Sequence, residues 1–227
     1  MLPALNDTSS QQAQPTENTR AKTQKLMDYA ATYPDAYIRY YASDMILHVD
    51  SDAAYLVLPK ARSRIAGYYY FSKPNGQLNG PVHIECRTIE HVVASAVEAE
   101  TSGTFHNGQT TLPFRIILIA IEHPQPPTPI KTDNTTAHGF IYDNIQLKRS
   151  KSWDMRYYWL RDKRTHGKFK LFWEKGTSNE ADYFTKHHPT IYHRQMRPRY
   201  IKDKIEHAIN SMASVLRGCI IPCVVWA

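Results

Sequence analysis

The stretch "LHVDSDAAYL" (residues 47–56) begins as a strand and places two carboxylates, Asp50 and Asp52, two positions apart. Because strand side chains alternate between two faces, both aspartates are predicted to point the same way. Like charges at this spacing repel each other, and a sheet core is a costly place for them. A bound cation, or a sharp turn that brings both side chains to water, would relieve the repulsion.

The composition is that of a globular, basic protein. The 227 residues are 42% hydrophobic, enough for a core in one large domain or two small ones. The net charge of +7 and the pI of about 9.2 favour an anionic partner, although a solvated basic surface would give the same values. Three cysteines (Cys86, Cys219 and Cys223) give no disulfide framework and suit a reducing compartment. We therefore expect an intracellular protein.

No segment predicts export or membrane insertion. The first twenty residues lack the basic start and apolar run of a signal peptide. The longest apolar run, "CIIPCVVWA", is far shorter than the roughly 20 residues that span a bilayer. No membrane partner is expected.

The chain is predicted to contain four parts. Residues 1–19 are polar and predicted to be disordered, and residues 20–44 form a connection with one short helix. Residues 45–200 form the main domain, and residues 201–227 a C-terminal helix and tail.

Within the main domain the hydrophobic pattern predicts an α/β fold. Three strands separated by turn formers suggest an antiparallel meander, at residues 45–52, 64–72 and 82–89. A helix follows across 89–107, and Pro113 is predicted to start or break a second one. Further strands are predicted at 130–134 and 168–175, and helices across 135–144, across 150–166 and after Ser178 as an N-cap.

Four acids stand at informative places in this order of elements. Asp52 ends the first strand, Glu100 lies in the long helix, Asp133 ends the fourth strand, and Asp182 lies early in the helix after the fifth. If the first and fourth strands are neighbours, the four carboxylates converge and need divalent metal; hard oxygen ligands select Mg²⁺ or Mn²⁺. Two ions about 4 Å apart can hold a phosphodiester, activate water and stabilise the leaving oxygen. Asp52 is then a ligand and Asp50 a spare acid beside it.

Each acid alone has an ordinary structural explanation. Asp133 could cap a helix, Asp182 could favour a helix N-terminus, and Asp52 could begin a turn. Glu100 could form a solvated pair with Glu98. Only their joint placement favours a catalytic role.

Five motifs in order resemble one family. These are "SDAAYLVLPKARSRIAGYYYF", "ASAVEAE", "KTDNTTA", "RSKSWDMRYYWLRD" and "NEADYFTK". Together they resemble the ribonuclease H domain of copia-type retrotransposon polyproteins, the region that follows the reverse transcriptase. The resemblance implies a ribonuclease H-like fold over residues 45–200, with a five-stranded mixed sheet of three antiparallel strands and two parallel additions, flanked by helices.

The resemblance also implies an activity and its site. The expected reaction is hydrolysis of the RNA strand of RNA–DNA hybrids with two Mg²⁺ (or Mn²⁺) ions, held by Asp52, Glu100, Asp133 and Asp182. Reverse transcriptase and integrase regions of the same polyprotein are expected partners, and the resemblance implies a cytoplasmic, particle-associated location or a nuclear one. The sequence departs from the family after Glu100, where "TSGTF" includes Gly103, which costs a helix about 1 kcal/mol relative to Ala. An alternative is therefore an inactive remnant that only binds nucleic acid.

Two further groups of residues carry weaker predictions. Basic residues mixed with aromatic ones predict contacts with nucleic-acid phosphates at Lys60, Arg62, Arg64, Lys148, Arg149 and Lys151. A zinc site at His187, His188, His193, Cys219 and Cys223 is conceivable, but the intervals fit no established zinc pattern.

Overall fold

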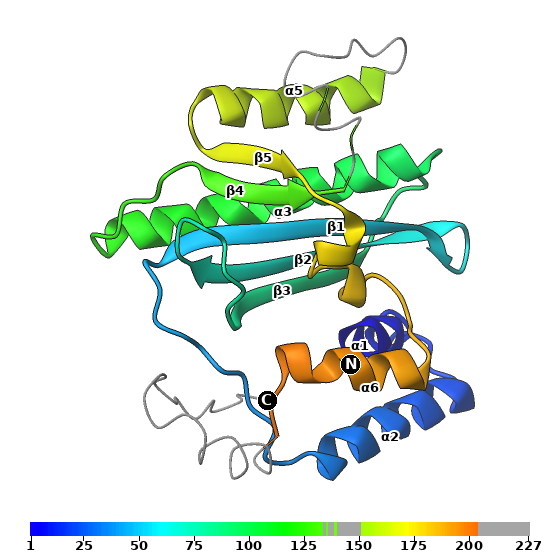
Figure 1. The fold of residues 1–227 in the computed structure, drawn as a ribbon. Helices are drawn as coiled ribbons and strands as arrows, with labels where there is room; N and C mark the ends of the chain where they lie inside the picture. Colours follow the sequence, from blue (N-terminus) through cyan, green and yellow to red (C-terminus); the bar gives the residue numbers. More distant parts are fainter. Residues whose placement is uncertain (134, 136–138, 140–150, 204–227) are drawn as a thin grey trace.

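The computed structural model describes residues 1–133, 135, 139 and 151–203, and a five-stranded mixed sheet forms its centre (Figure 1). Three strands pair antiparallel: β1 (Ile46–Leu58), β2 (Arg62–Ser72) and β3 (Pro81–Thr88). On the other side of β1, β4 (Thr128–Thr132) and β5 (Phe169–Trp173) add in parallel, giving the order β3-β2-β1-β4-β5. The predicted sheet, a meander with two parallel additions flanked by helices, is confirmed.

Strand β2 is buried on both faces, which explains its continuous aromatic run "GYYYF". Tyr69 points to the cluster between the sheet and helix α3 (Ala96–Ala120), together with Leu47, Val49 and Leu118. Tyr68 and Tyr70 point to the opposite cluster, with Phe184 and Tyr200 among its members. The sheet therefore lies between two apolar clusters, one on each of its faces.

Helix α3 runs without a break through Pro113, so the prediction of a separate second helix is wrong. An internal proline costs a helix about 3 kcal/mol, and tertiary contacts beyond it offset that cost. Arg115 Nη1 lies 2.7 Å from Thr128 Oγ1, and Arg115 Nη2 donates to the carbonyl of Gln125 at 3.1 Å. These bonds hold the half of α3 after Pro113 against the start of β4.

Helix α5 (Lys151–Thr165) agrees with the helix predicted across 150–166 and packs against α3. Leu160 and Tyr157 are buried, and the hydroxyls of Tyr157 and Thr101 are 2.6 Å apart. Of the helix predicted across 135–144, only residues 135 and 139 lie within the described part of the chain.

The N-terminal residues differ from the prediction of disorder. Helix α1 (Leu2–Ser9) and helix α2 (Glu17–Thr32) lie next to α6 (Thr190–Tyr200) (Figure 1), and Leu2 and Tyr200 pack with the cluster of Tyr68 and Tyr70 on β2. A capping box between Thr16 and Thr19 starts α2, and its Thr-to-Thr form differs from the commoner Glu or Gln version. The domain boundaries proposed from the sequence stay a prediction.

The helix predicted to start at Ser178 is also wrong. Two short 3₁₀ turns replace it: η1 (Gly176–Ser178) and η2 (Asp182–Phe184). Asn179 uses its amide to donate to the carbonyl of Ser51 at 2.7 Å and to accept from the amide of Ala181 at 3.0 Å. Such side-chain bonds compete with helix formation, and α6 begins only after Pro189.

Among the described residues, none of the helices combines the length and apolar character needed to cross a bilayer.

Candidate active site

Asp52 and Asp133 lie beside each other because β1 and β4 are parallel neighbours. The register pairs Val49 with Ile130 and Asp50 with Lys131. Continuing this register by two residues brings Asp52 level with Asp133, which directly follows β4. The sheet topology therefore joins two acids that are far apart in the sequence.

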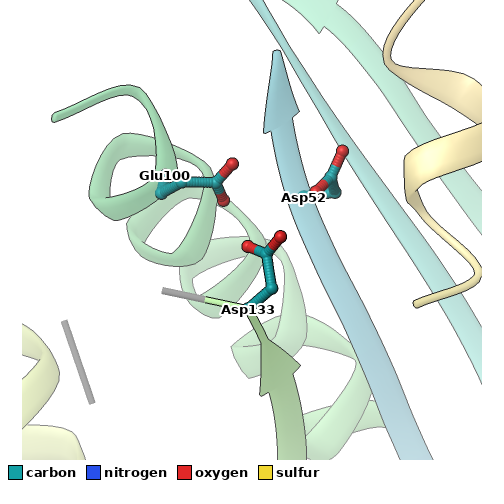
Figure 2. A group of neighbouring side chains, drawn as sticks. All are labelled: Asp52, Glu100 and Asp133. Carbon is teal, nitrogen blue, oxygen red and sulfur yellow. The ribbon is translucent and has the colours of Figure 1, made fainter. Parts of the chain in front are cut away.

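Helix α3 supplies the third carboxylate, Glu100. One carboxylate oxygen from each of Asp52, Glu100 and Asp133 lies within 4.8 Å of the other two, and the three side chains converge (Figure 2). Glu100 Oε1 accepts from the backbone amide of Ala53 at 3.2 Å, which ties the helix to β1. Glu100 Oε2 is buried and has no hydrogen-bond partner among the described residues. We call these three side chains the acid triad.

Gly103 explains how α3 comes so near to β1. A Cβ at this position would lie 3.2 Å from the carbonyl oxygen of Asp52 and 3.4 Å from Cβ of Ala53. The glycine thus gives the room that a larger residue would take, one turn after Glu100. The unusual "TSGTF" sequence does not interrupt the helix.

The acid triad is electrostatically costly in the absence of a cation. Burial, with the negative charges of Asp182 and Asp133, raises the pKa of Asp52 to about 7. Burial and the charges of Asp52 and Asp133 raise the pKa of Glu100 well above its ordinary value. Burial and the charge of Asp182 likewise raise the pKa of Asp133. The three groups can all be ionised at neutral pH only if positive charge is supplied.

Asp182 is the predicted acid that does not join the triad. It lies in η2, and its Oδ1 is 2.7 Å from Nζ of Lys186 one turn later. Its negative charge nevertheless acts on all three triad carboxyls. Three of the four predicted ligands are therefore brought together, and a metal-binding role for Asp182 stays a prediction.

Asp50, the predicted spare acid, holds the segment that leads to Asp182. Its side chain is fully buried, and Oδ2 accepts from the backbone amide of Glu180 at 3.1 Å. Nζ of Lys131 lies 3.9 Å from Oδ1, too far for a hydrogen bond, so burial dominates and raises the pKa of Asp50 to about 7. Asp50 thus anchors a loop, while Asp52 belongs to the triad.

Three polar residues beside the site were not singled out from the sequence: Asn179, Thr185 and Lys186. Asn179 binds the carbonyl of Ser51. The Thr185 hydroxyl donates to the carbonyl of Asp182 at 2.9 Å, and its interaction with Asp52 opposes the rise of the Asp52 pKa. Thr185 and Lys186 belong to the quoted motif "NEADYFTK", which was the available signal.

The donor set fits a divalent metal ion. All three groups offer carboxylate oxygens, the ligands that Mg²⁺ and Mn²⁺ prefer. The unpaired, buried Glu100 oxygen is the kind of atom that a metal would satisfy. A Cβ on Gly176 would lie only 3.0 Å from Oδ2 of Asp133, so the glycine leaves this carboxylate room.

The residues predicted to contact nucleic acid differ in their exposure and in their partners. Lys60 is exposed in the turn between β1 and β2, and Arg62 is partly buried. Arg64 is fully buried and ion-paired with Asp7, so the prediction that it contacts phosphates is wrong. Lys148 and Arg149 lie outside the described residues, as does the side chain of Lys151.

The three histidines of the conceivable zinc site have other partners. His187 Nε2 is 2.6 Å from Asp7 Oδ2, and His188 Nε2 is 3.2 Å from the carbonyl of Tyr183. His193 contacts the hydroxyls of Tyr183 and Tyr29. Cys219 and Cys223 lie outside the described residues.

Comparison with known proteins finds similarity only at the level of structure. No protein-family model matches the sequence, and no curated protein does either. Similar solved structures include a ribonuclease H1 isolated from compost by a metagenomic approach (9% identity, TM-score 0.49, 62% of this chain and 93% of that one). The ribonuclease H1 of Halobacterium salinarum is 14% identical (TM-score 0.45; 61% and 93% covered).

A viral structure is also similar to this chain. The foamy viral protease–reverse transcriptase, solved with double-stranded DNA, is 15% identical (TM-score 0.40; 64% of this chain and 92% of that one).

Proposed function

We propose that the protein is a metal-dependent ribonuclease that hydrolyses the RNA strand of RNA–DNA hybrids. In this proposal Asp52, Glu100 and Asp133 bind Mg²⁺ or Mn²⁺, and Asp182 completes the site for a second ion. The observation that carries the proposal is the convergence of one carboxylate oxygen from each of Asp52, Glu100 and Asp133 within 4.8 Å, beside a buried Glu100 oxygen that has no hydrogen-bond partner among the described residues. A structural role alone would leave this repulsion without compensation.

The residues of the chain have distinct tasks in such a site. When bound, two ions can hold the phosphodiester, activate water and stabilise the leaving oxygen. Asp52 lies in the middle of β1, which continues to Leu58 beyond the strand end predicted from the sequence, and Asp133 directly follows β4, so neighbouring strands carry the two carboxylates. Glu100 is fixed by the amide of Ala53 and keeps one oxygen free for metal. Asp50 and Asn179 hold the loop that carries Asp182 against β1.

The five ordered motifs support a finer assignment. We propose that the chain corresponds to the ribonuclease H region of a copia-type retrotransposon polyprotein, beside reverse transcriptase and integrase regions. An A-form-like hybrid would be read mainly by its shape and its 2′-hydroxyl groups, with the net charge of +7 favouring binding. Exposed Lys60 is the described candidate for a phosphate contact.

The alternative is an inactive remnant that binds nucleic acid without cutting it. The sequence argument for it was a helix disturbed at Gly103. That argument weakens because α3 is continuous and Gly103 fits closely against Asp52. Binding without cleavage in both Mg²⁺ and Mn²⁺ would favour the remnant.

The test is cleavage of an RNA–DNA hybrid labelled on its RNA strand, with Mg²⁺, with Mn²⁺ and with a chelator. Double-stranded RNA and double-stranded DNA serve as control substrates. We expect metal-dependent cleavage of the hybrid RNA, lost at least 100-fold in Asp52→Asn. Asp28→Asn, which changes an exposed aspartate of α2, is the matched control and should still bind Mn²⁺ in calorimetry. Mn²⁺ binding as strong in Asp52→Asn as in Asp28→Asn would contradict the ligand assignment.

A further inference from the structure

The fully buried side chains of the sheet include the cationic Arg64 on β2. Its exposed fraction is 0%, and its counter-ion is Asp7, near the end of helix α1. A guanidinium buried without a partner is strongly unfavourable. The N-terminal helix therefore supplies the charge that lets Arg64 remain inside.

Arg64 is also connected to the segment that carries Asp182. Its Nη1 donates to the carbonyl oxygen of Thr185 at 3.4 Å. The hydroxyl of Thr185 donates to the carbonyl of Asp182 and interacts with the carboxyl group of Asp52. Only Ile65 separates Arg64 from Ala66, the cross-strand partner of Asp52. The ion pair and the acid triad are thus linked through a single residue, Thr185.

Asp7 contacts the same segment at a second point. Its Oδ2 lies 2.6 Å from Nε2 of His187, the residue after Lys186. One carboxylate of α1 therefore bridges a buried cation of the sheet and the chain just after η2. Asn6 adds a contact to β3, since the hydroxyl of Thr88 donates to its side-chain oxygen at 3.3 Å.

We propose that Asp7 is a positioning residue for the metal site. By pairing with Arg64 and His187 it fixes residues 182–186, so helix α1 is part of the functional unit although it lies outside the sheet and touches no triad carboxylate. The inference rests on the proposed metal site. It assigns to the N-terminal segment a role that the five sequence motifs do not include.

The test measures metal binding separately from catalysis in the full-length protein. Groups that orient metal ligands typically change affinity or activity 10- to 100-fold when replaced. We expect Asp7→Asn to weaken Mn²⁺ binding about 10-fold in calorimetry and to lower kcat similarly, with KM for the hybrid unchanged. Asp7→Glu should restore most of the affinity. Asp28→Asn, on the exposed side of α2, is the matched control and should change neither value.

A double-mutant cycle shows whether Asp7 acts through Arg64. Removing one partner of a buried ion pair is destabilising, whereas replacing both partners is often neutral, so the unfolding temperature of Arg64→Met is measured before it is used as the background. In that background Asp7→Asn should have little further effect on Mn²⁺ affinity. The inference is overturned if Asp7→Asn lowers the unfolding temperature but leaves Mn²⁺ affinity and kcat within twofold. If the wild type binds Mn²⁺ without cleaving the hybrid, the proposed function fails while the affinity measurements still decide the role of Asp7.

Discussion

Nζ of Lys186 lies 2.7 Å from Oδ1 of Asp182, so a cation of the chain itself stands beside the acid triad. Both side chains are partly exposed, and such a pair contributes only about 0–1 kcal/mol. The pair matters for the site because the positive charge of Lys186 opposes the rise in the pKa of Asp52. A divalent ion that uses Asp182 must displace or share this contact.

We therefore predict that Lys186→Met lowers the unfolding temperature without metal and increases the rise in unfolding temperature on adding metal. In chelator the variant should unfold at a lower temperature, because less positive charge offsets the carboxylates. The rise in unfolding temperature on adding Mn²⁺ should be larger than in the wild type, because Lys186 no longer competes for Asp182. Lys163→Met, which breaks a pair with Asp162, is the control. An equal Mn²⁺-induced rise in Lys186→Met and in the wild type would show that Lys186 does not compete with metal.

A second prediction concerns pH. The pKa of Asp52 is about 7 in the folded protein against an ordinary 3.8 in the unfolded chain. Between these values the folded state binds more protons than the unfolded state, so the free energy of unfolding falls as pH rises. The penalty is absent below the lower value and complete above pH 7.

Thermal unfolding in chelator between pH 5 and pH 8 checks this prediction. The wild type should lose at least about 1 kcal/mol more than Asp52→Asn over this range, since one pKa unit corresponds to 1.36 kcal/mol. Excess Mn²⁺ should remove or reverse the difference, because metal binds the ionised carboxylates. Parallel pH profiles for the two proteins in chelator would show that Asp52 ionises normally.

The third prediction compares two glycines of α3. Gly103→Ala gains about 1 kcal/mol of helix propensity but puts a Cβ against the backbone of Asp52, and overpacking costs about 1–3 kcal/mol. At Gly108 the new Cβ would meet the side chains of Trp159 and Leu160. Both variants can lower stability, yet only Gly103→Ala should also weaken Mn²⁺ binding, because it moves Glu100 relative to Asp52. Equal Mn²⁺ affinities in the two variants would separate Gly103 from the site.

The fourth prediction distinguishes a surface cation from a buried one. Lys60→Ala should lower the slope of log affinity against log salt by about one, as expected for one lost phosphate contact. Arg64→Ala should instead destabilise the fold by about 3–5 kcal/mol, because Asp7 loses its partner. Hybrid binding across about 50–200 mM salt and denaturant unfolding measure the two effects. A lower salt slope in Arg64→Ala, with unchanged stability, would restore the direct contact predicted from the sequence.

The sheet and most of the site were predictable because they depend on local patterns. Alternation and turn formers mark β1 to β3, and the order of elements placed Asp133 correctly at the end of β4, whereas β1 continues past Asp52 to Leu58. Arg64 was misread because a cationic residue in a basic run resembles a surface residue. Its counter-ion, Asp7, comes from a helix 57 positions away, and no local pattern shows such a pairing.

Helix lengths were less predictable for similar reasons. An internal proline breaks most helices. Helix α3 continues past Pro113 because Arg115 makes hydrogen bonds at the start of β4. The segment around Asp182 has helix-like spacing, but the amide of Asn179 is used by β1. In both cases a tertiary hydrogen bond outweighs the local preference.

The parallel pairing of β1 with β4 has a consequence for the order of folding. Val49 and Ile130 meet only after a long intervening chain has been closed into a loop, which is entropically unfavourable and slow compared with hairpin formation. The β1–β2–β3 meander can form from neighbouring segments, whereas the triad requires residues from β1, α3 and the end of β4. A metal ion that binds the triad would then recognise only chains that have completed this late step. The rate at which Mn²⁺ binding appears during refolding would therefore report the rate at which β4 joins β1.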